Sequence, residues 1–369
     1  MASDASPIAG VSRRDFLKFC GWVAAMIGAG TGATPEVAAA IERLAKRPQV
    51  VWSSFQICTG CAVQLLECRT PPVAQLILQQ ISVEYQDNVM AAAGKQAEAQ
   101  REKIVNSGDF YWVAEGSIAT KDPGMMTIAG KPSTDIALEI YSKAKAVIAT
   151  GSCSSYGNVQ ASRPNPSGAM GLSDYLKQQG ALSASKPVVN MPRCPGQAED
   201  LVAALVYILV YGKAPELDAV GRPKIFYGTL IHDHCERRGH FDAGEFVETF
   251  GDEASAKEWC WYKVGCKGPQ TFAPCPINRW NGHLSWCVNN GPCIGCAEPG
   301  FWDNFTPFTS RSTTVAPGIG GVSAQTVGEV LGVAAAVGIG AHLIGSAATG
   351  RLSHPPEPEP VDRGPNKAL

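Results

Sequence analysis

The stretch Gln49-Val-Val-Trp-Ser-Ser-Phe-Gln-Ile-Cys58-Thr-Gly-Cys61 decides the fold, because a short apolar run ends in a loop that presents two cysteines. This pattern is typical of a β-strand that leads into a ligand-binding loop. Similar runs predict further strands, and helix-like stretches lie between them. We expect strands at 49–52, 110–114, 146–149 and 187–190, and helices at 72–81, 133–143 and 198–211. The alternation predicts an α/β fold with a doubly wound parallel sheet.

The loops after three of these strands carry cysteines. Loops at the carboxyl ends of parallel strands converge on one crevice, so we expect these cysteines to lie together although they are far apart in sequence. With one histidine, eleven of the thirteen cysteines form three groups of four possible ligands. The first group is Cys58, Cys61, Cys153 and Cys194; the second is His232, Cys235, Cys260 and Cys266; the third is Cys275, Cys287, Cys293 and Cys296.

Four thiolates, sometimes with an imidazole in place of one, are the usual ligands of an iron–sulfur cluster. The sequence therefore predicts three [4Fe-4S] clusters, and the four cysteines of the third group favour [4Fe-4S] over [3Fe-4S] there. In the second group, His232 stands three residues before Cys235, whereas His234 is its direct neighbour and reaches the same metal less easily. An imidazole ligand tends to raise the potential of a cluster, which suits one near the surface where electrons leave.

Other interpretations of the cysteines stay open at this point. A C-x-x-C pair alone fits a redox dithiol or half of a zinc site, and oxidising compartments favour disulfides. The alternative function is therefore an exported zinc-binding or disulfide-stapled interaction protein. Cys68 is better explained as a small buried hydrophobe. Glu115 could orient the first cysteine loop, pass protons, or simply accept hydrogen bonds from backbone amides.

The overall composition limits the kinds of partner that the chain is expected to bind. A formal charge of −2 without a basic run excludes nucleic acid as the expected partner. At 369 residues, with 45% hydrophobic and 17% charged side chains, the chain has room for two domains that pack against something large.

From about residue 221, glycine, proline, tryptophan and cysteine are concentrated, and we expect one helix there, at 243–250 after a possible N-cap at Asp242. Such a segment is expected to draw its order from metal binding.

The two ends of the chain carry a candidate export signal and a candidate membrane helix. Ser12-Arg-Arg-Asp-Phe-Leu-Lys18 followed by an apolar stretch is a twin-arginine export signature, and Cys20 within it is not an expected ligand. Near the other end, 330–350 contains no Asp, Glu, Lys or Arg, and its length suits a membrane helix of ~20 residues. The alternative is a surface helix packed on a partner. A spanning helix that leaves the tail after Arg351 in the cytoplasm places the cysteine groups on the periplasmic face.

The expected organisation is therefore a signal peptide at 1–46, an α/β domain with the first group at 47–220, and an irregular cysteine-rich domain at 221–312. The chain then continues with a linker at 313–325, a transmembrane helix at 326–350 and a polar tail at 351–369.

Over nearly its whole length the chain resembles the small subunit of nickel–iron hydrogenases. The segments that carry the resemblance are the twin-arginine signature, Cys58-Thr-Gly-Cys61, Val113-Ala-Glu-Gly-Ser-Ile118, Gly151-Ser-Cys153, Cys194-Pro-Gly196, Leu230-Ile-His-Asp-His-Cys-Glu-Arg-Arg238, Gly265-Cys-Lys-Gly-Pro269, Pro292-Cys-Ile-Gly-Cys-Ala-Glu-Pro299 and Phe301-Trp-Asp303. The related cluster-bearing subunit of respiratory complexes is a rival whose resemblance covers only the first domain. The hydrogenase resemblance implies a flavodoxin-like first domain, with the first group holding a proximal cluster, the third a medial cluster and the second a distal cluster.

The resemblance also implies partners and a reaction. The nickel–iron centre belongs to a separate large subunit that performs H2 ⇌ 2H+ + 2e−, and this chain passes the electrons to a membrane cytochrome, a ferredoxin-like subunit or a soluble carrier. Cys287 stands where many members have a proline and a [3Fe-4S] cluster, so the third group is similar to nickel–iron–selenium forms. Oxygen-tolerant members carry two extra cysteines at positions that are Gly60 and Asn158 here, so we expect an ordinary proximal cluster.

Overall fold

The computed structural model describes residues 47–69, 71–77, 81–279, 288, 291–311 and 324–351. The predicted signal peptide, Cys287 and most of the predicted linker and tail lie outside the described residues. Contacts divide the chain into two compact units, which meet in sequence between Arg311 and Ser312. The predicted boundary between two domains near residue 220 falls inside the first unit and stays a prediction.

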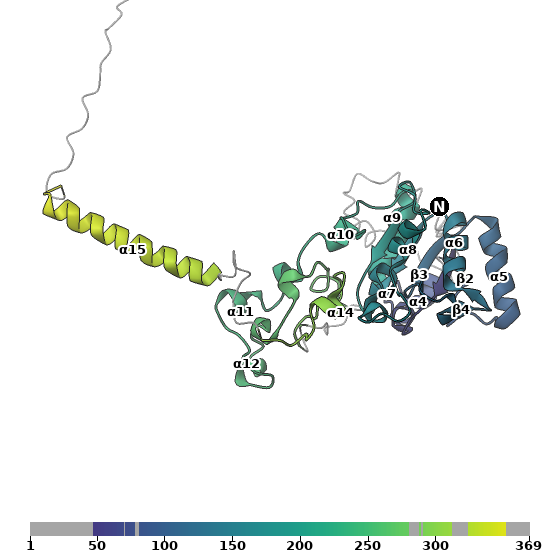
Figure 1. Ribbon diagram of the computed structural model, residues 1–369, viewed down its shortest axis with the longest axis horizontal. Helices are drawn as coiled ribbons and strands as arrows, with labels where there is room; N and C mark the ends of the chain where they lie inside the picture. Colours follow the sequence, from purple (N-terminus) through teal and green to yellow (C-terminus); the bar gives the residue numbers. More distant parts are fainter. Residues whose placement is uncertain are drawn as a thin grey trace, which may run out of the picture. The chain divides into compact units, whose positions relative to one another are not determined.

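A five-stranded parallel sheet organises the first unit (Figure 1). Its strands are β1 (Gln49–Ser54), β2 (Ser82–Tyr85), β3 (Tyr111–Glu115), β6 (Val147–Thr150) and β7 (Val188–Met191), in the spatial order β2-β1-β3-β6-β7. The short strands β4 (Thr127–Ile128) and β5 (Lys131–Pro132) form a separate antiparallel pair. With that pair set aside, the order corresponds to the 2-1-3-4-5 arrangement of flavodoxin-like folds. The predicted doubly wound parallel sheet is confirmed.

Both faces of the sheet are covered by helices, so side chains that alternate along a strand enter two different cores. In β1, Val50 and Trp52 pack with α3 (Gly60–Leu66) and α9 (Ala198–Tyr211). Val51 points to the other face, which is covered by α5 (Gly94–Ser107), α6 (Ser133–Lys143) and α8 (Leu172–Gln178). The helices expected at 133–143 and 198–211 are confirmed.

The segment between β1 and β3 differs from the prediction. Of the helix expected at 72–81, only α4 (Val73–Gln75) is an α-helix, and 78–80 lie outside the described residues. Ile81 directly precedes the unpredicted strand β2, which pairs with β1 at the edge of the sheet. The long helix α5 was also not predicted, because a buried arginine, Arg101, occupies its inward face between Ala97 and Ile104 and interrupts the apolar periodicity.

After α9 the chain forms mostly short elements joined by irregular stretches (Figure 1). They are α10 (Lys224–Tyr227), η4 (Ile231–His234), α11 (Arg238–Asp242), α12 (Glu253–Ala256), η5 (Tyr262–Val264), η6 (Gly268–Gln270) and α14 (Phe301–Asn304). The helix predicted at 243–250 is wrong. Helix α11 ends at Asp242, and Gly244 adopts φ +74°, a left-handed conformation that ends helices. Beyond it, the amide of Val247 donates to the carbonyl oxygen of Cys260 at 2.9 Å.

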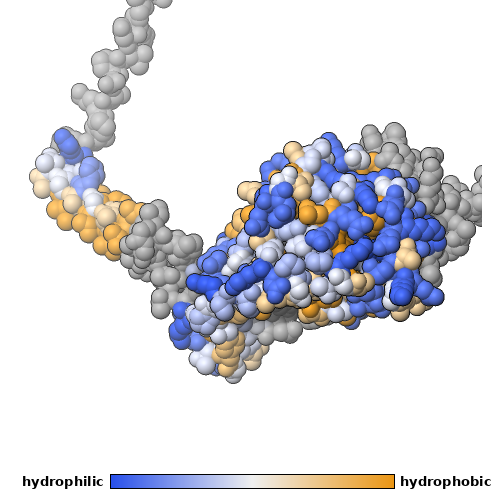
Figure 2. All heavy atoms as spheres, turned by 45° about the vertical axis from the view of Figure 1, so that its right-hand side comes forward, coloured by the Kyte–Doolittle hydropathy of each residue, from blue (hydrophilic) through white to orange (hydrophobic). Residues whose placement is uncertain are grey.

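The second unit contains the helix α15 (Ala324–Ala348). Its segment Val330–Ala348 has a mean hydropathy of 1.8 and is long and apolar enough to cross a membrane. Figure 2 shows hydrophobic residues along this helix, and Val330, Val337 and Ile344 are all exposed. The predicted helix at 326–350 is confirmed as a helix.

Candidate metal centres

The first group of cysteines comes together at the carboxyl ends of the parallel strands. Cys61 lies in α3 after β1, Cys153 lies in α7 (Gly151–Tyr156) directly after β6, and Cys194 follows β7. The side-chain amide of Asn158 connects two of them, because its Nδ2 lies 3.1 Å from Cys153 Sγ and 3.4 Å from Cys194 Sγ. Cys58 completes the group, since its thiol acts electrostatically on those of Cys153 and Cys194. The four predicted ligands are therefore neighbours.

Glycines allow the loops of the first group to approach one another closely. Gly151 has φ +76°, and a Cβ atom on it would lie 2.5 Å from Cys61 Sγ. Gly196 donates its backbone amide to the same sulfur at 3.3 Å. Amides that point at sulfur stabilise the negative charge of a bound cluster. Glycine is thus required here for backbone conformation and for space.

Glu115 anchors the loop that carries Cys58 and Cys61. Its carboxylate accepts hydrogen bonds from the backbone amides of Cys61 at 3.2 Å and Ala62 at 3.4 Å, and from Trp52 Nε1 at 2.8 Å. Burial raises the pKa of Glu115, and the bonds from Trp52 and the two amides oppose that rise. The interpretation of Glu115 as a carboxylate that bonds backbone amides is confirmed.

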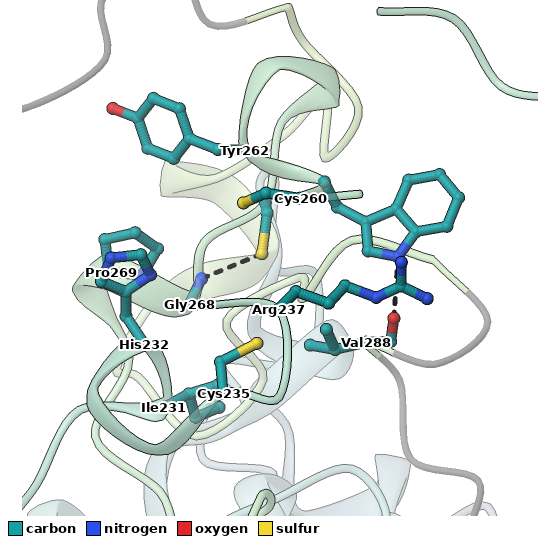
Figure 3. A pocket seen from close by; sticks show the side chains of 11 residues that line it. Ile231, His232, Cys235, Arg237, Cys260, Tyr262, Gly268, Pro269 and Val288 are labelled. Atoms are coloured by element: carbon teal, nitrogen blue, oxygen red, sulfur yellow. Dashed lines mark hydrogen bonds between the residues drawn. The ribbon is translucent and has the colours of Figure 1, made fainter. Parts of the chain in front are cut away.

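The second group lines a single small hollow (Figure 3). His232, Cys235, Cys260 and Cys266 all border it, and Figure 3 shows the labelled Cys235 and Cys260 sulfurs directed into the space. The His232 ring packs edge-on against Phe241, with ring centroids 4.4 Å apart. Gly268 donates its amide to Cys266 Sγ at 3.4 Å. His234, which the sequence disfavours as a ligand, does not line this hollow.

The third group is described for three of its four members. Cys275, Cys293 and Cys296 border one hollow, and the fourth predicted ligand, Cys287, lies outside the described residues. Gly295 donates its amide to Cys293 Sγ at 3.4 Å. Cys194 of the first group borders the same hollow. The first and third groups are therefore adjacent.

Backbone amides join the three groups in one order. The amide of Cys194 hydrogen-bonds to the sulfur of Cys296, which links the first group to the third. The amide of Cys293 donates to Cys266 Sγ at 3.3 Å, which links the third group to the second. At both junctions a ligand candidate of one group contacts the sulfur of the next. The third group thus lies between the other two.

The electrostatics of the thiols test whether iron–sulfur clusters fit. Burial raises the pKa of Cys153, Cys260 and Cys275 to about 11. Burial also raises the pKa of Cys61, and Glu115 and the thiols of its own group add to the rise. Such crowded thiols become thiolates together only when a cation compensates their charge, and ligated iron supplies it. The donor set therefore fits iron–sulfur clusters.

The alternative interpretations fit less well. All the cysteines that the structure describes carry free thiols, which gives the disulfide alternative no support. Among the described residues, no three His, Cys, Asp or Glu side chains surround a point that one ion could occupy. A structural zinc site instead draws four ligands around a single ion. Cys68 is 4% exposed in the core, so its interpretation as a buried hydrophobe is confirmed.

Two residues at these centres were missed by the sequence analysis. Ser152 Oγ donates to the carbonyl oxygen of Cys296 at 2.5 Å and accepts from the amide of Arg193 at 3.0 Å, so it joins the loops of the first and third groups. Arg193 itself is buried beside the third group. Their position next to Cys153 and Cys194 was the only signal that could have identified them.

Comparisons with known proteins agree with this arrangement. The family of the C-terminal part of NiFe/NiFeSe hydrogenase small subunits matches residues 227–309, and the family NADH ubiquinone oxidoreductase, 20 Kd subunit, matches 58–208. The periplasmic [NiFe] hydrogenase small subunit 1 of Nitratidesulfovibrio vulgaris is 45% identical over 302 residues, which cover 81% of this chain and 93% of the relative. The quinone-reactive Ni/Fe-hydrogenase small chain of Wolinella succinogenes is 42% identical over 347 residues, which cover 91% and 96%.

Solved structures show the same relationship. A small subunit in the reduced, active Ni-Fe-Se hydrogenase of Desulfomicrobium baculatum has a TM-score of 0.66 and 34% identity, covering 72% of this chain and 100% of that one. An actinobacterial-type NiFe-hydrogenase from Ralstonia eutropha has a TM-score of 0.64 and 26% identity, covering 88% and 95%.

A flavodoxin-like sheet joined to a cysteine-rich segment, with three adjoining groups of candidate cysteine and histidine ligands, defines an iron–sulfur electron-transfer subunit of an oxidoreductase. The chain belongs to the small subunits of nickel–iron hydrogenases. It pairs with a large subunit and relays electrons for the hydrogenase reaction.

Proposed function

We propose that this subunit relays electrons singly through three [4Fe-4S] clusters between the nickel–iron centre of its large subunit and an external acceptor. The first group would hold the proximal cluster, the third the medial cluster and the second the distal cluster. The observation that carries this proposal is the contact of the third group with both others through ligand amides and ligand sulfurs. When bound, each cluster accepts and returns one electron.

The chain's own residues hold and insulate this path. Amides of Gly196, Gly295 and Gly268 donate to sulfurs of the first, third and second groups respectively. Burial of the surrounding side chains excludes water and lowers the local dielectric, so these bonds act strongly on the charge of a ligated sulfur. Fixed donors of this kind remain in place when an electron passes.

The two ends of the relay face different partners. Cys58 is exposed at the carboxyl edge of the sheet, Val63 in α3 and Val159 next to Asn158 are exposed as well, and this edge suits the large subunit that performs H2 ⇌ 2H+ + 2e−. At the other end, His232 is half-exposed, and an imidazole ligand raises the potential of a cluster there. Electrons would leave from the second group to a membrane cytochrome, a ferredoxin-like subunit or a soluble carrier.

Cys287 supports a four-iron cluster in the third group, because it supplies the fourth thiolate beside Cys275, Cys293 and Cys296. Asn158 donates to two sulfurs of the first group at the position where oxygen-tolerant members of the family carry an extra cysteine. We infer an ordinary proximal cluster that lacks this oxygen-tolerance device.

The proposed location is the periplasmic face of the cytoplasmic membrane. The twin-arginine signature supports export of a folded subunit, and the apolar helix α15 supports anchoring in the membrane. A periplasmic and a quinone-reactive hydrogenase are among the relatives, which agrees with this location.

The decisive experiment is anaerobic purification of the complex with its large subunit, followed by iron and sulfide analysis and electron paramagnetic resonance. We expect about twelve iron atoms in this subunit, four for each cluster. Pale material that contains zinc or cystines instead of iron would refute the proposal. A sharp three-iron signal in the oxidised enzyme would refute the role of Cys287.

A further inference from the structure

A buried cation lies next to the first and third groups. Arg193 immediately precedes Cys194, and its side chain is 1% exposed. Its Nη1 lies 3.3 Å from Oδ2 of Asp200, which is equally buried, and its Nη2 donates to the carbonyl oxygen of Asn278 at 3.3 Å. Asn278 Nδ2 in turn donates to Asp200 Oδ1 at 2.8 Å. The guanidinium is therefore held in one orientation.

This guanidinium acts on the third group of cysteines. The Arg193 guanidinium lies beside the thiol of Cys275, and its positive charge acts on Cys275 and Cys296. The backbone on either side is fixed as well, because the amide of Ser152 donates to the carbonyl oxygen of Arg193 at 2.9 Å. A permanent positive charge thus contacts one ligand candidate directly, within a region from which water is excluded.

The backbone at Arg193 does not favour a side chain. Its φ is +152°, in the region that glycine adopts most easily, so a large side chain is strained there. A buried ion pair is also a weak source of stability, because desolvation of both charges offsets their attraction. Neither backbone conformation nor stability therefore explains an arginine at this position, whereas the contact with Cys275 does.

We propose that Arg193 is a positioning residue that raises the reduction potential of the cluster held by the third group, with Asp200 fixing the guanidinium and moderating its charge. This inference rests on the proposed cluster ligation. Reduction adds one negative charge to a cluster, and a neighbouring cation or a hydrogen bond to its sulfur stabilises the reduced form. The opposite charge of Asp200 destabilises the reduced form and reduces the effect of Arg193.

The test is a potentiometric titration of the purified complex, followed by electron paramagnetic resonance of each cluster. Arg193→Met should lower the midpoint potential of the medial cluster more than those of the other two, and Asp200→Asn should raise it. Arg193→Lys retains the charge and should give a smaller shift than Arg193→Met. The double variant Arg193→Met/Asp200→Asn leaves no unpaired buried charge and should fall between the two single variants.

A matched control is available in α5, where Arg101 is also 1% exposed and pairs with Glu98 at 2.9 Å. Arg101 packs in the core on the opposite face of the sheet from α3 and α9. Arg101→Met removes the same charge and should leave the three midpoint potentials unchanged.

The outcomes separate this inference from the proposed function. If the wild-type complex lacks iron in the third group, the proposed ligation is wrong and the inference fails with it. If the variants retain the iron of the wild type and the medial potential of Arg193→Met is unchanged, or that of the double variant is no lower than that of Asp200→Asn, the ligation stands and the inference is overturned. Shifts of both single variants in the same direction would also overturn it, because a charge effect requires opposite signs.

Discussion

Replacement of Gly151 by alanine should prevent the first cluster from assembling. Two effects add at this position. The backbone has φ +76°, a conformation that strains a non-glycine residue by about 1–3 kcal/mol. The new Cβ atom would also lie 2.5 Å from Cys61 Sγ, a contact that forces this sulfur to move. Overpacking of this kind costs a further ~1–3 kcal/mol.

Gly212 provides the matched control. It has φ +66° at the end of α9, but a Cβ atom there meets nothing within 4 Å. Gly212→Ala therefore carries the backbone strain alone. The difference between the two variants isolates the steric effect on Cys61.

The assay is iron analysis with electron paramagnetic resonance of anaerobically purified complexes. We expect Gly151→Ala to lose about four iron atoms and the proximal signal, and Gly212→Ala to retain all three clusters. If both variants contain the same amount of iron and show the same proximal signal, the close approach of the two loops does not control assembly and the reasoning is wrong.

Four further changes have expected outcomes. Asn158→Ala removes donors to two sulfurs of the first group and should lower the proximal midpoint potential in a redox titration; an unchanged value with full iron content would contradict this. Cys287→Ala should produce a three-iron signal in the oxidised enzyme, and its absence would argue against ligation. Replacement of both Arg13 and Arg14 by lysine should retain the enzyme in the cytoplasm, and fractionation showing normal export would exclude the twin-arginine route. Truncation after Arg311 removes the separate second unit and should release an enzyme with all its clusters from the membrane fraction; persistent attachment would show another anchor.

The central part of the fold could be predicted because strands buried on both faces form continuous apolar runs. This holds for β3, β6 and β7, each of which was expected within one or two residues. The edge strand β2 is partly exposed and carries Ser82 and Glu84, so its composition resembles that of a loop. Helix α5 was missed because Arg101 is buried through ion pairs with Glu98 and Glu139, which form only in the folded chain.

The sequence predicts more of the candidate centres than of the fold that surrounds them. Cysteine in glycine-rich loops indicates ligands directly, and the first and second groups come together as expected. Spacing alone could not order the groups in space, because the third group in sequence lies between the other two. Spacing also could not identify Ser152 or Arg193. The contact between Ser152 and Cys296, for example, joins segments that are more than a hundred residues apart in the sequence.

The cysteines of the first group are widely separated in the sequence, and this affects the order in which the protein is assembled. Its members lie after β1, β6 and β7, and β7 is the last strand to leave the ribosome and occupies an edge of the sheet. The complete ligand set therefore exists only after the whole sheet has formed. For a cluster held by these four cysteines, iron would be inserted late in biogenesis, into a sheet that has already formed, and the cluster would then join loops that lie far apart in the sequence.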